Sequence, residues 1–176
     1  MGRNRVVVAG VDGCKGGWLV ALWERGVELI LCADFAGVVE VTRDCRAVAV
    51  DMPIGLALPG QTRGCDRAAR KLLGRKSSSV FSAPPREALD CTDYQLVRGW
   101  GMSLQSFYLL PKVREVDAWM TPERQLRVSE AHPELVWARL AGAPVLASKK
   151  TLEGASRVVA MGGACVEVAA QPGAAR

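Results

Sequence analysis

The sequence predicts an α/β fold in which helices flank a mixed sheet of five strands. Near the N-terminus, three short apolar segments are separated by turns that are short enough for antiparallel hairpins. Farther along, helical patterns separate the remaining two strands, and connections of that length permit parallel pairing. With 176 residues, of which 49% are hydrophobic and 23% charged, the chain suits one globular domain with a sizeable core.

Three strands are predicted in quick succession, over residues 5–11, 18–23 and 27–32. A helix over residues 34–44 follows, with Asp34 at its N-cap, where a short acidic side chain can accept a hydrogen bond from a free backbone amide. Residues 46–51 form the predicted fourth strand. Because a helix separates it from the third strand, the fourth strand is the first that can pair in parallel.

Helical segments dominate the second half of the chain. They are predicted over residues 63–73, 94–119, 133–140 and 149–161. The second of them is expected to break at Pro111, since an interior proline removes a helical hydrogen bond. Residues 127–131 supply a short fifth strand, and the Gly- and Ala-rich tail over residues 162–176 is expected to be loose. One domain over residues 1–161 with this order of elements is typical of ribonuclease H-like proteins.

Two buried strands are each followed by a carboxylate. The apolar residues 6–11 lead to Asp12 and then to a glycine-rich turn that contains Lys15, and residues 47–50 lead to Asp51. A charge at the end of a buried strand is stable where a metal ion or hydrogen-bond donors bind it. We therefore expect the two carboxylates to form one shared acidic site. The alternative is that each carboxylate caps the backbone of its own turn.

Composition narrows the class of protein and its partners. No apolar stretch approaches the ~20 residues that span a bilayer, and no signal-peptide pattern precedes the first strand, so a cytoplasmic protein without a membrane partner is expected. The six cysteines include no Cys-x-x-Cys pair and His132 is the only histidine, which argues against a zinc site and favours reduced thiols. A net charge of +5 favours anionic partners.

Basic side chains follow one face of the helix predicted over residues 63–73. Helical spacing places in one stripe Arg63, Arg67, Arg70 and Lys71. Leu72 is expected on the opposite, buried face. The stripe either follows a phosphate backbone or is an ordinary solvated helix face. No aromatic residues alternate with the stripe, so stacking on nucleic-acid bases is not predicted there.

Five motifs occur in order along the chain. They are Gly10-Val11-Asp12-Gly13-Cys14-Lys15-Gly16-Gly17-Trp18; Asp51-Met52-Pro53-Ile54-Gly55-Leu56; Arg63-Gly64-Cys65-Asp66 with Ala69-Arg70, Leu73-Gly74, Ser79-Val80-Phe81 and Pro84; Lys112-Val113-Arg114-Glu115-Val116-Asp117; and Glu130-Ala131-His132-Pro133-Glu134. Over residues 6–157 the chain thereby resembles DUF429, a family of unknown function whose members are regarded as nucleases with a ribonuclease H-like fold.

The resemblance implies hydrolysis of phosphodiester bonds in DNA or RNA. A metal-dependent nuclease needs rigid oxygen ligands, and we expect Asp12, Asp51 and Glu130 to bind Mg²⁺ or Mn²⁺. Glu130 and His132 alternate along the predicted fifth strand and so face the same side, where His132 would orient water or stabilise the leaving group. Lys15 is expected to bind a phosphate oxygen, and the basic stripe to bind the nucleic-acid backbone.

Three other acidic residues have simpler interpretations. Glu134 follows Pro133 and is expected in the first turn of a helix, where a negative charge is favourable. Glu115 and Asp117 are two residues apart, so on a helix they point to different faces, and a solvated pair is expected.

The chain departs from the family at its end. Members of DUF429 usually continue into an Ala- and Asp-rich helix, whereas Glu167 is the only acidic residue after Glu153. We therefore expect the C-terminal helix to be missing or divergent, metal affinity to be weak, nuclease activity to be feeble or absent, and exposed apolar sheet surface to favour self-association into a homo-oligomer.

Two other functions stay open at this point. The first is a non-catalytic nucleic-acid-binding or scaffold domain of the same fold, which the departure at the C-terminus favours. The second is a phosphate-loop lobe like those of actin-like ATPases and sugar kinases, with residues 12–16 as the loop. Such enzymes enclose a nucleotide between two lobes, so the second ranks last for a chain of 176 residues.

Overall fold

A computed structural model describes residues 7–142 of the chain. The described strands are β1 (Val8–Cys14), β2 (Gly17–Trp23), β3 (Val27–Cys32), β4 (Ala47–Val50) and β5 (Val128–Glu130). The described α-helices are α1 (Phe35–Val41), α2 (Gly64–Leu73), α3 (Tyr94–Arg98), α4 (Leu104–Trp119) and α5 (Pro133–Ala141), and the 3₁₀ helices are η1 (Gly74–Ser79), η2 (Arg86–Asp90) and η3 (Arg124–Leu126). The helix predicted over residues 149–161 and the tail over 162–176 lie outside the described residues.

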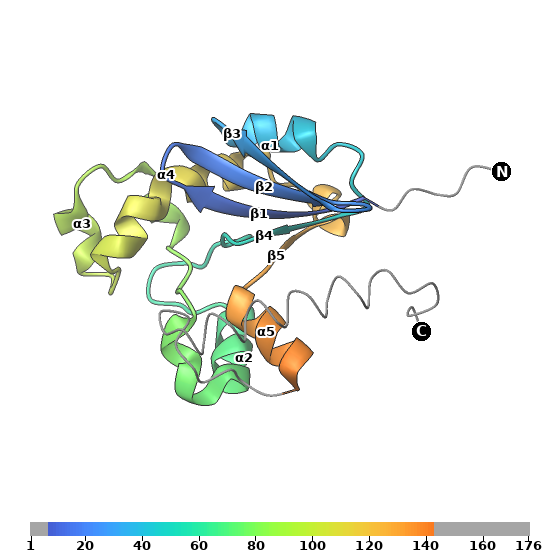
Figure 1. Ribbon diagram of the computed structural model, residues 1–176. Helices are drawn as coiled ribbons and strands as arrows, with labels where there is room; N and C mark the ends of the chain where they lie inside the picture. The colour runs from blue at the N-terminus through green and yellow to red at the C-terminus, as the bar shows by residue number, and fades with distance from the viewer. Residues whose placement is uncertain (1–6, 143–176) are drawn as a thin grey trace. The chain divides into compact units, whose positions relative to one another are not determined.

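The strands form one mixed sheet in the order β3-β2-β1-β4-β5 (Figure 1). The first three strands pair antiparallel, and β1 with β4 and β4 with β5 pair parallel. The connection through α1 allows β4 to lie beside β1, because a parallel neighbour cannot be reached by a tight hairpin. The predicted α/β class with three antiparallel and two parallel strands is confirmed, and the arrangement is compatible with a ribonuclease H-like fold.

The β1–β2 hairpin is longer than the sequence pattern indicates. β1 continues to Cys14, which pairs with Gly17, so that Lys15 and Gly16 alone form the turn. Gly17 has a φ of 142°, and a Cβ there would lie 2.0 Å from the carbonyl oxygen of Cys32, so only glycine fits. Asp12 consequently lies inside β1 and not in the turn after it.

One face of the sheet forms the main core. Because side chains alternate along each strand, this face carries buried residues of the sheet, among them Ala9, Val11, Trp18, Val20, Val48, Val50 and Val128. Helices α1 and α4 lie on the same side (Figure 1), and they contribute Phe35, Val38, Leu110, Val113 and Val116 to the same cluster. Asp34 caps α1 as predicted, since its side chain accepts a hydrogen bond from the amide of Gly37.

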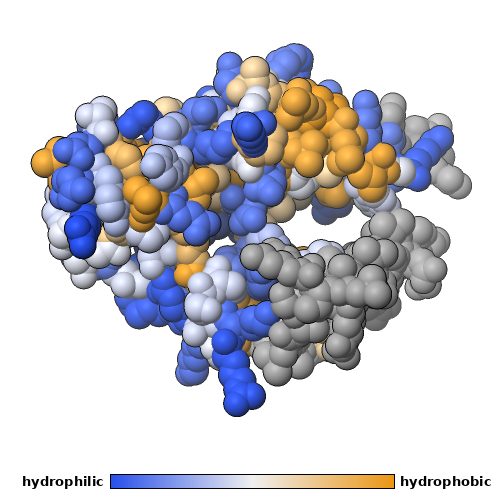
Figure 2. All heavy atoms as spheres, turned by 60° about the vertical axis from the view of Figure 1, so that its left-hand side comes forward, coloured by the Kyte–Doolittle hydropathy of each residue, from blue (hydrophilic) through white to orange (hydrophobic). Residues whose placement is uncertain are grey.

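The opposite face of β2 and β3 carries exposed apolar side chains. They are Leu19, Val27, Leu29 and Leu31, with exposed fractions of 40%, 60%, 64% and 66%. The register pairs Leu19 with Leu31, and alternation puts the other two on the same face. Figure 2 shows hydrophobic side chains gathered in a patch on this part of the surface.

The helix break expected at Pro111 is wrong. Pro111 is exposed within α4, which runs without interruption from Leu104 to Trp119. The break lies earlier, between α3 and α4, where Gly101 has a φ of 75°. Burial of Leu110 and Val113 on either side of the proline holds the helix against the core, and this packing outweighs the one hydrogen bond that proline removes.

The described residues divide into two compact units. Residues 7–64 and 81–131 form the first unit, which contains the sheet, and residues 65–80 and 132–142 form the second, with most of α2, η1 and α5. In the second unit Ala69, Leu73 and Val80 are buried. Leu72, which was expected to be buried, is 69% exposed, because α2 buries the face at positions 66, 69 and 73. No described helix has the length and hydrophobicity required to cross a bilayer.

Candidate functional site

Asp12 lies inside β1, two residues before its end, and Asp51 directly follows β4, the parallel neighbour of β1. Val11 pairs with Val50, and the amide of Asp51 donates to the carbonyl oxygen of Val11 at 2.8 Å. Val11 and Val50 are buried on the core face, so alternation puts the residues that directly follow them, Asp12 in β1 and Asp51 after β4, on the opposite face. Asp12 is exposed and Asp51 half-buried. The structure thus brings these two predicted site residues together.

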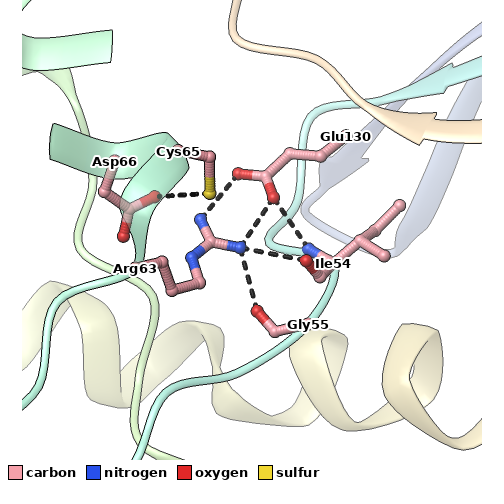
Figure 3. Close-up of polar contacts among 6 residues, drawn as sticks. All are labelled: Ile54, Gly55, Arg63, Cys65, Asp66 and Glu130. Carbon is pink, nitrogen blue, oxygen red and sulfur yellow. Dashed lines mark hydrogen bonds and ion pairs between the residues drawn. The ribbon is translucent and has the colours of Figure 1, made fainter. Parts of the chain in front are cut away.

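Glu130 is not brought together with Asp12. In β5 it pairs with Val50, so its side chain starts from the core face of the sheet and Asp12 from the other. Both carboxylate oxygens of Glu130 are bound to Arg63: Nη1 lies 2.7 Å from Oε2 and Nη2 lies 2.9 Å from Oε1 (Figure 3). The amide of Ile54 donates to Oε2 at 2.9 Å. The carboxylate that was expected to bind metal therefore accepts hydrogen bonds from the Arg63 guanidinium and the Ile54 amide.

Arg63 does not belong to the exposed stripe in which it was predicted. It precedes α2, and only 9% of its side chain is exposed. Besides Glu130, its Nη1 donates to the carbonyl oxygens of Ile54 at 3.1 Å and Gly55 at 2.9 Å. Sequence spacing could not detect the ion pair, because Glu130 is 67 residues away from Arg63 in the sequence.

The remaining predicted cations lie on α2 in the second unit. Arg67 and Lys71 are exposed, whereas Arg70 is half-buried and donates to the carbonyl oxygen of Val80 at 3.3 Å. Arg75 in η1 is exposed as well. In the described part of the second unit, every charged side chain classed as exposed is cationic: Arg67, Lys71, Arg75 and Arg139. The described part of this unit therefore presents positive charge to solvent.

His132 lies in the second unit as the N-cap of α5 and not on β5, which ends at Glu130. Its Nε2 lies 2.8 Å from the carbonyl oxygen of Ser79, so Nε2 carries the proton and donates. Its Nδ1 is buried and lies 3.5 Å from Oε2 of Glu134. Pro133 and Glu134 begin α5 as expected. These contacts join His132 to η1 and to the first turn of α5.

Two charged residues of α4 support the β1–β2 hairpin from the core side. Lys112 donates to the carbonyl oxygen of Gly17, and its ammonium lies 4.6 Å from the centre of the Trp18 ring. A Cβ at Gly13 would lie 2.6 Å from Lys112 Cδ, so the lysine fills the space that this glycine leaves. Oε2 of Glu115 accepts from Trp18 Nε1 at 2.9 Å and from the amide of Phe35 at 2.7 Å.

Asp117 has a partner in the first unit as well. It forms a bidentate ion pair with Arg86, at 2.6 and 2.8 Å. The hydrogen bond and the negative charge of Asp117 raise the pKa of the Arg86 guanidinium. The expectation that Glu115 and Asp117 form a solvated pair is therefore wrong, because each binds a different segment.

Comparison with protein families assigns the chain. The family model described as "Protein of unknown function (DUF429)" matches residues 10–168, which is most of the sequence. The chain belongs to the DUF429 family. No curated protein and no solved structure gives a significant match. The DUF429 match includes the β1–β2 hairpin, the segment after β4, β5 and residues beyond the described part of the chain.

Sequence reasoning missed the roles of Lys112 and Glu115 in this DUF429 protein, although both belong to a quoted motif. Their spacing of three residues places them on one helix face, which was the available signal. Their partners on β2 and α1 are 80 to 97 residues away in sequence, so the contacts themselves could not be predicted.

The side chains that could bind a metal ion in the described part of this DUF429 chain are few. Among residues 7–142, no group of three or more His, Cys, Asp or Glu side chains could hold a metal ion. Asp12 and Asp51 supply two neighbouring carboxylates. Mg²⁺ commonly binds one or two carboxylates and takes its other oxygens from water and substrate phosphates. Asp12 and Asp51 are the neighbouring pair of carboxylates that the described residues offer to such an ion.

Proposed function

We propose that this DUF429 protein hydrolyses phosphodiester bonds of nucleic acid with the help of one Mg²⁺ or Mn²⁺ ion bound by Asp12 and Asp51. The observation that carries the proposal is the neighbouring position of the two residues, because Asp12 follows Val11 in β1 and Asp51, which follows β4, donates its amide to Val11. Hard oxygen ligands on two hydrogen-bonded strands are rigid, and rigidity is what a cation that orients a phosphate requires.

The chain's own residues have separate tasks in this proposal. Asp12 and Asp51 bind the cation, which supplies polarisation of the phosphodiester and activation of water. Lys15 is exposed in the two-residue turn that follows β1, and its ammonium binds a phosphate oxygen. Glu130 stays with Arg63, so the site contributes two negative charges and its affinity for the cation is weak.

The exposed cations of the second unit bind the nucleic-acid backbone. Arg67 and Lys71 are four residues apart on α2, a rise of about 6 Å along the helix axis. A spacing of this order lets the two side chains contact neighbouring phosphates of one strand. Phosphate contacts of this kind carry affinity without sequence specificity.

Calorimetric titration with Mn²⁺ tests the metal site directly. Wild type, Asp12→Asn and Asp51→Asn are compared, with Asp90→Asn as the control because Asp90 is an exposed carboxylate of η2. We expect one weak site in wild type and in the control, and a loss of at least about tenfold in affinity in the other two variants. Equal affinity in all four proteins would show that the ion binds elsewhere.

Cleavage assays test the chemistry. Labelled single-stranded DNA, duplex DNA, single-stranded RNA and an RNA–DNA hybrid are incubated with wild type in Mn²⁺ or in chelator. We expect slow cleavage that needs Mn²⁺ and is abolished by Asp12→Asn. Cleavage that survives in the Asp12→Asn variant would come from a contaminant or from a different site.

A second candidate function is nucleic-acid binding without hydrolysis. It is favoured by the small number of carboxylates at the site and by the capture of Glu130 by Arg63. In this case binding needs no metal. Lys71→Gln with Arg75→Gln should flatten the dependence of log K on log salt by about 1.4–1.8, given a slope of 0.7–0.9 per phosphate contact. Arg25→Gln with Arg98→Gln, which removes two exposed cations of the first unit, is the matched control.

A further inference from the structure

The Arg63–Glu130 ion pair joins β5 to the segment that follows β4. We propose that this pair is a positioning device that holds residues 51–55, and with them Asp51, in one conformation. Arg63 and Glu130 are then positioning residues and neither contacts metal or nucleic acid. The consequence for metal binding rests on the proposed function, whereas the effect on residues 51–55 does not.

The contacts enclose one short piece of backbone. Glu130 accepts the amide of Ile54, and Arg63 donates to the carbonyl oxygens of Ile54 and Gly55. Both polar groups of the Ile54 backbone are thereby bound, three residues after Asp51 (Figure 3). A single ion pair thus anchors the downstream end of the segment.

The sheet anchors the upstream end. The amide of Asp51 donates to Val11 on one side, and the carbonyl oxygen of Val50 accepts from Ala131 on the other, at 2.8 and 2.9 Å. Met52 and Pro53 between the two anchors are buried. With both ends bound and the middle packed, Asp51 has little backbone freedom, and a ligand that is already positioned loses less entropy when a cation binds.

Arginine is needed for this arrangement. Its planar fork makes the bidentate contact with Glu130 while Nη1 also reaches two carbonyl oxygens. A lysine ammonium keeps the charge but is a compact point donor and cannot make the same set of contacts. With 9% of the Arg63 side chain and 31% of the Glu130 side chain exposed, the pair is shielded enough for its geometry to matter.

The proposal and the metal-ligand hypothesis for Glu130 predict opposite results for Arg63→Lys. If Glu130 were a ligand held in reserve, weakening its ion pair would release it and leave Mn²⁺ affinity unchanged or tighter. If the pair positions Asp51, Arg63→Lys and Glu130→Gln should each weaken Mn²⁺ binding, by about 10–100-fold, as loss of a supporting residue behind a metal ligand does.

Hydrogen exchange of the Ile54 amide, followed by mass spectrometry or NMR, is the second measurement and needs no metal. Wild type, Arg63→Lys and Glu130→Gln are compared, with Arg86→Lys as the matched control because Arg86 makes a bidentate pair with Asp117 elsewhere in the first unit. We expect exchange in residues 52–55 to rise at least tenfold in the first two variants and to stay at the wild-type rate in the control, with unchanged far-UV circular dichroism in all.

The two measurements separate the two ideas. Wild-type exchange at Ile54 in both Arg63→Lys and Glu130→Gln would overturn the positioning device, whatever the metal data show. Faster exchange together with unchanged or tighter Mn²⁺ binding would overturn its effect on Asp51. Absence of Mn²⁺ binding to the wild type would end the proposed function, while faster exchange in the two variants would still support the positioning of residues 51–55.

Discussion

Replacement of Glu115 by alanine tests the network that joins α4 to the sheet. One oxygen of this carboxylate accepts hydrogen bonds from Trp18 Nε1 and from the amide of Phe35. Both donors belong to fully or almost fully buried residues, with 0% and 3% exposed. Alanine removes the shared acceptor, so both N–H groups lose their partner at once.

The expected loss in the free energy of unfolding depends on how many buried N–H groups Glu115→Ala leaves without an acceptor. A buried donor without a partner costs about 1–3 kcal/mol, so two donors predict a loss of about 2–6 kcal/mol in the free energy of unfolding. Glu115 is half-buried, so water can reach part of the site, and we expect about 3 kcal/mol. That is a large share of the roughly 5–15 kcal/mol that stabilises a domain. Glu115→Gln keeps one carbonyl oxygen as acceptor and should cost about 1 kcal/mol.

Urea unfolding of the two variants, followed by far-UV circular dichroism, measures these values. A double-mutant cycle with Trp18→Phe isolates the indole contact, because phenylalanine has no N–H to leave unpaired. In the Trp18→Phe background, Glu115→Ala should cost about 1–3 kcal/mol less than in the wild type. Strict additivity, or a loss below about 0.5 kcal/mol for Glu115→Ala alone, would refute the idea that this carboxylate satisfies buried donors.

Three further predictions concern the sheet and its thiols. Gly17→Ala should lower the midpoint of thermal unfolding and cost at least about 2 kcal/mol of stability, because its Cβ would lie 2.0 Å from the carbonyl oxygen of Cys32. An unchanged midpoint would contradict the hairpin geometry. Burial raises the pKa of the Cys45 thiol, so the unfolded chain loses this proton at a lower pH than the folded chain. Stability should therefore fall as the pH rises from the ordinary thiol pKa to the raised one, and Cys45→Ala should make that fall shallower in urea titrations at several pH values. The double variant Leu29→Gln/Leu31→Gln should alter the unfolding free energy by less than about 0.5 kcal/mol, because both side chains are largely exposed. It should also reduce self-association measured by light scattering. Equal scattering would show that this patch does not mediate contacts between copies.

The sequence was sufficient for the class of the sheet and for the neighbouring backbone positions of Asp12 and Asp51. Apolar runs with short turns predict the antiparallel strands, and a helix before the fourth strand permits its parallel pairing with β1. Once β1 and β4 are neighbours, the pairing of Val11 with Val50 puts the residues that follow them, Asp12 and Asp51, beside each other. These features depend on local patterns and on connection length, which the sequence displays directly.

Only the tertiary structure decided on which face of the sheet Glu130 lies and which residue Arg63 binds. Glu130 reads as a third acidic ligand in the sequence, but its register with Val50 puts it on the face opposite Asp12. Arg63 continues the helical spacing of the other cations, but it binds Glu130 across 67 residues of sequence. Strand register and ion-pair choice depend on packing between distant segments and on the cost of leaving a shielded charge unpaired, and neither quantity is encoded in local spacing.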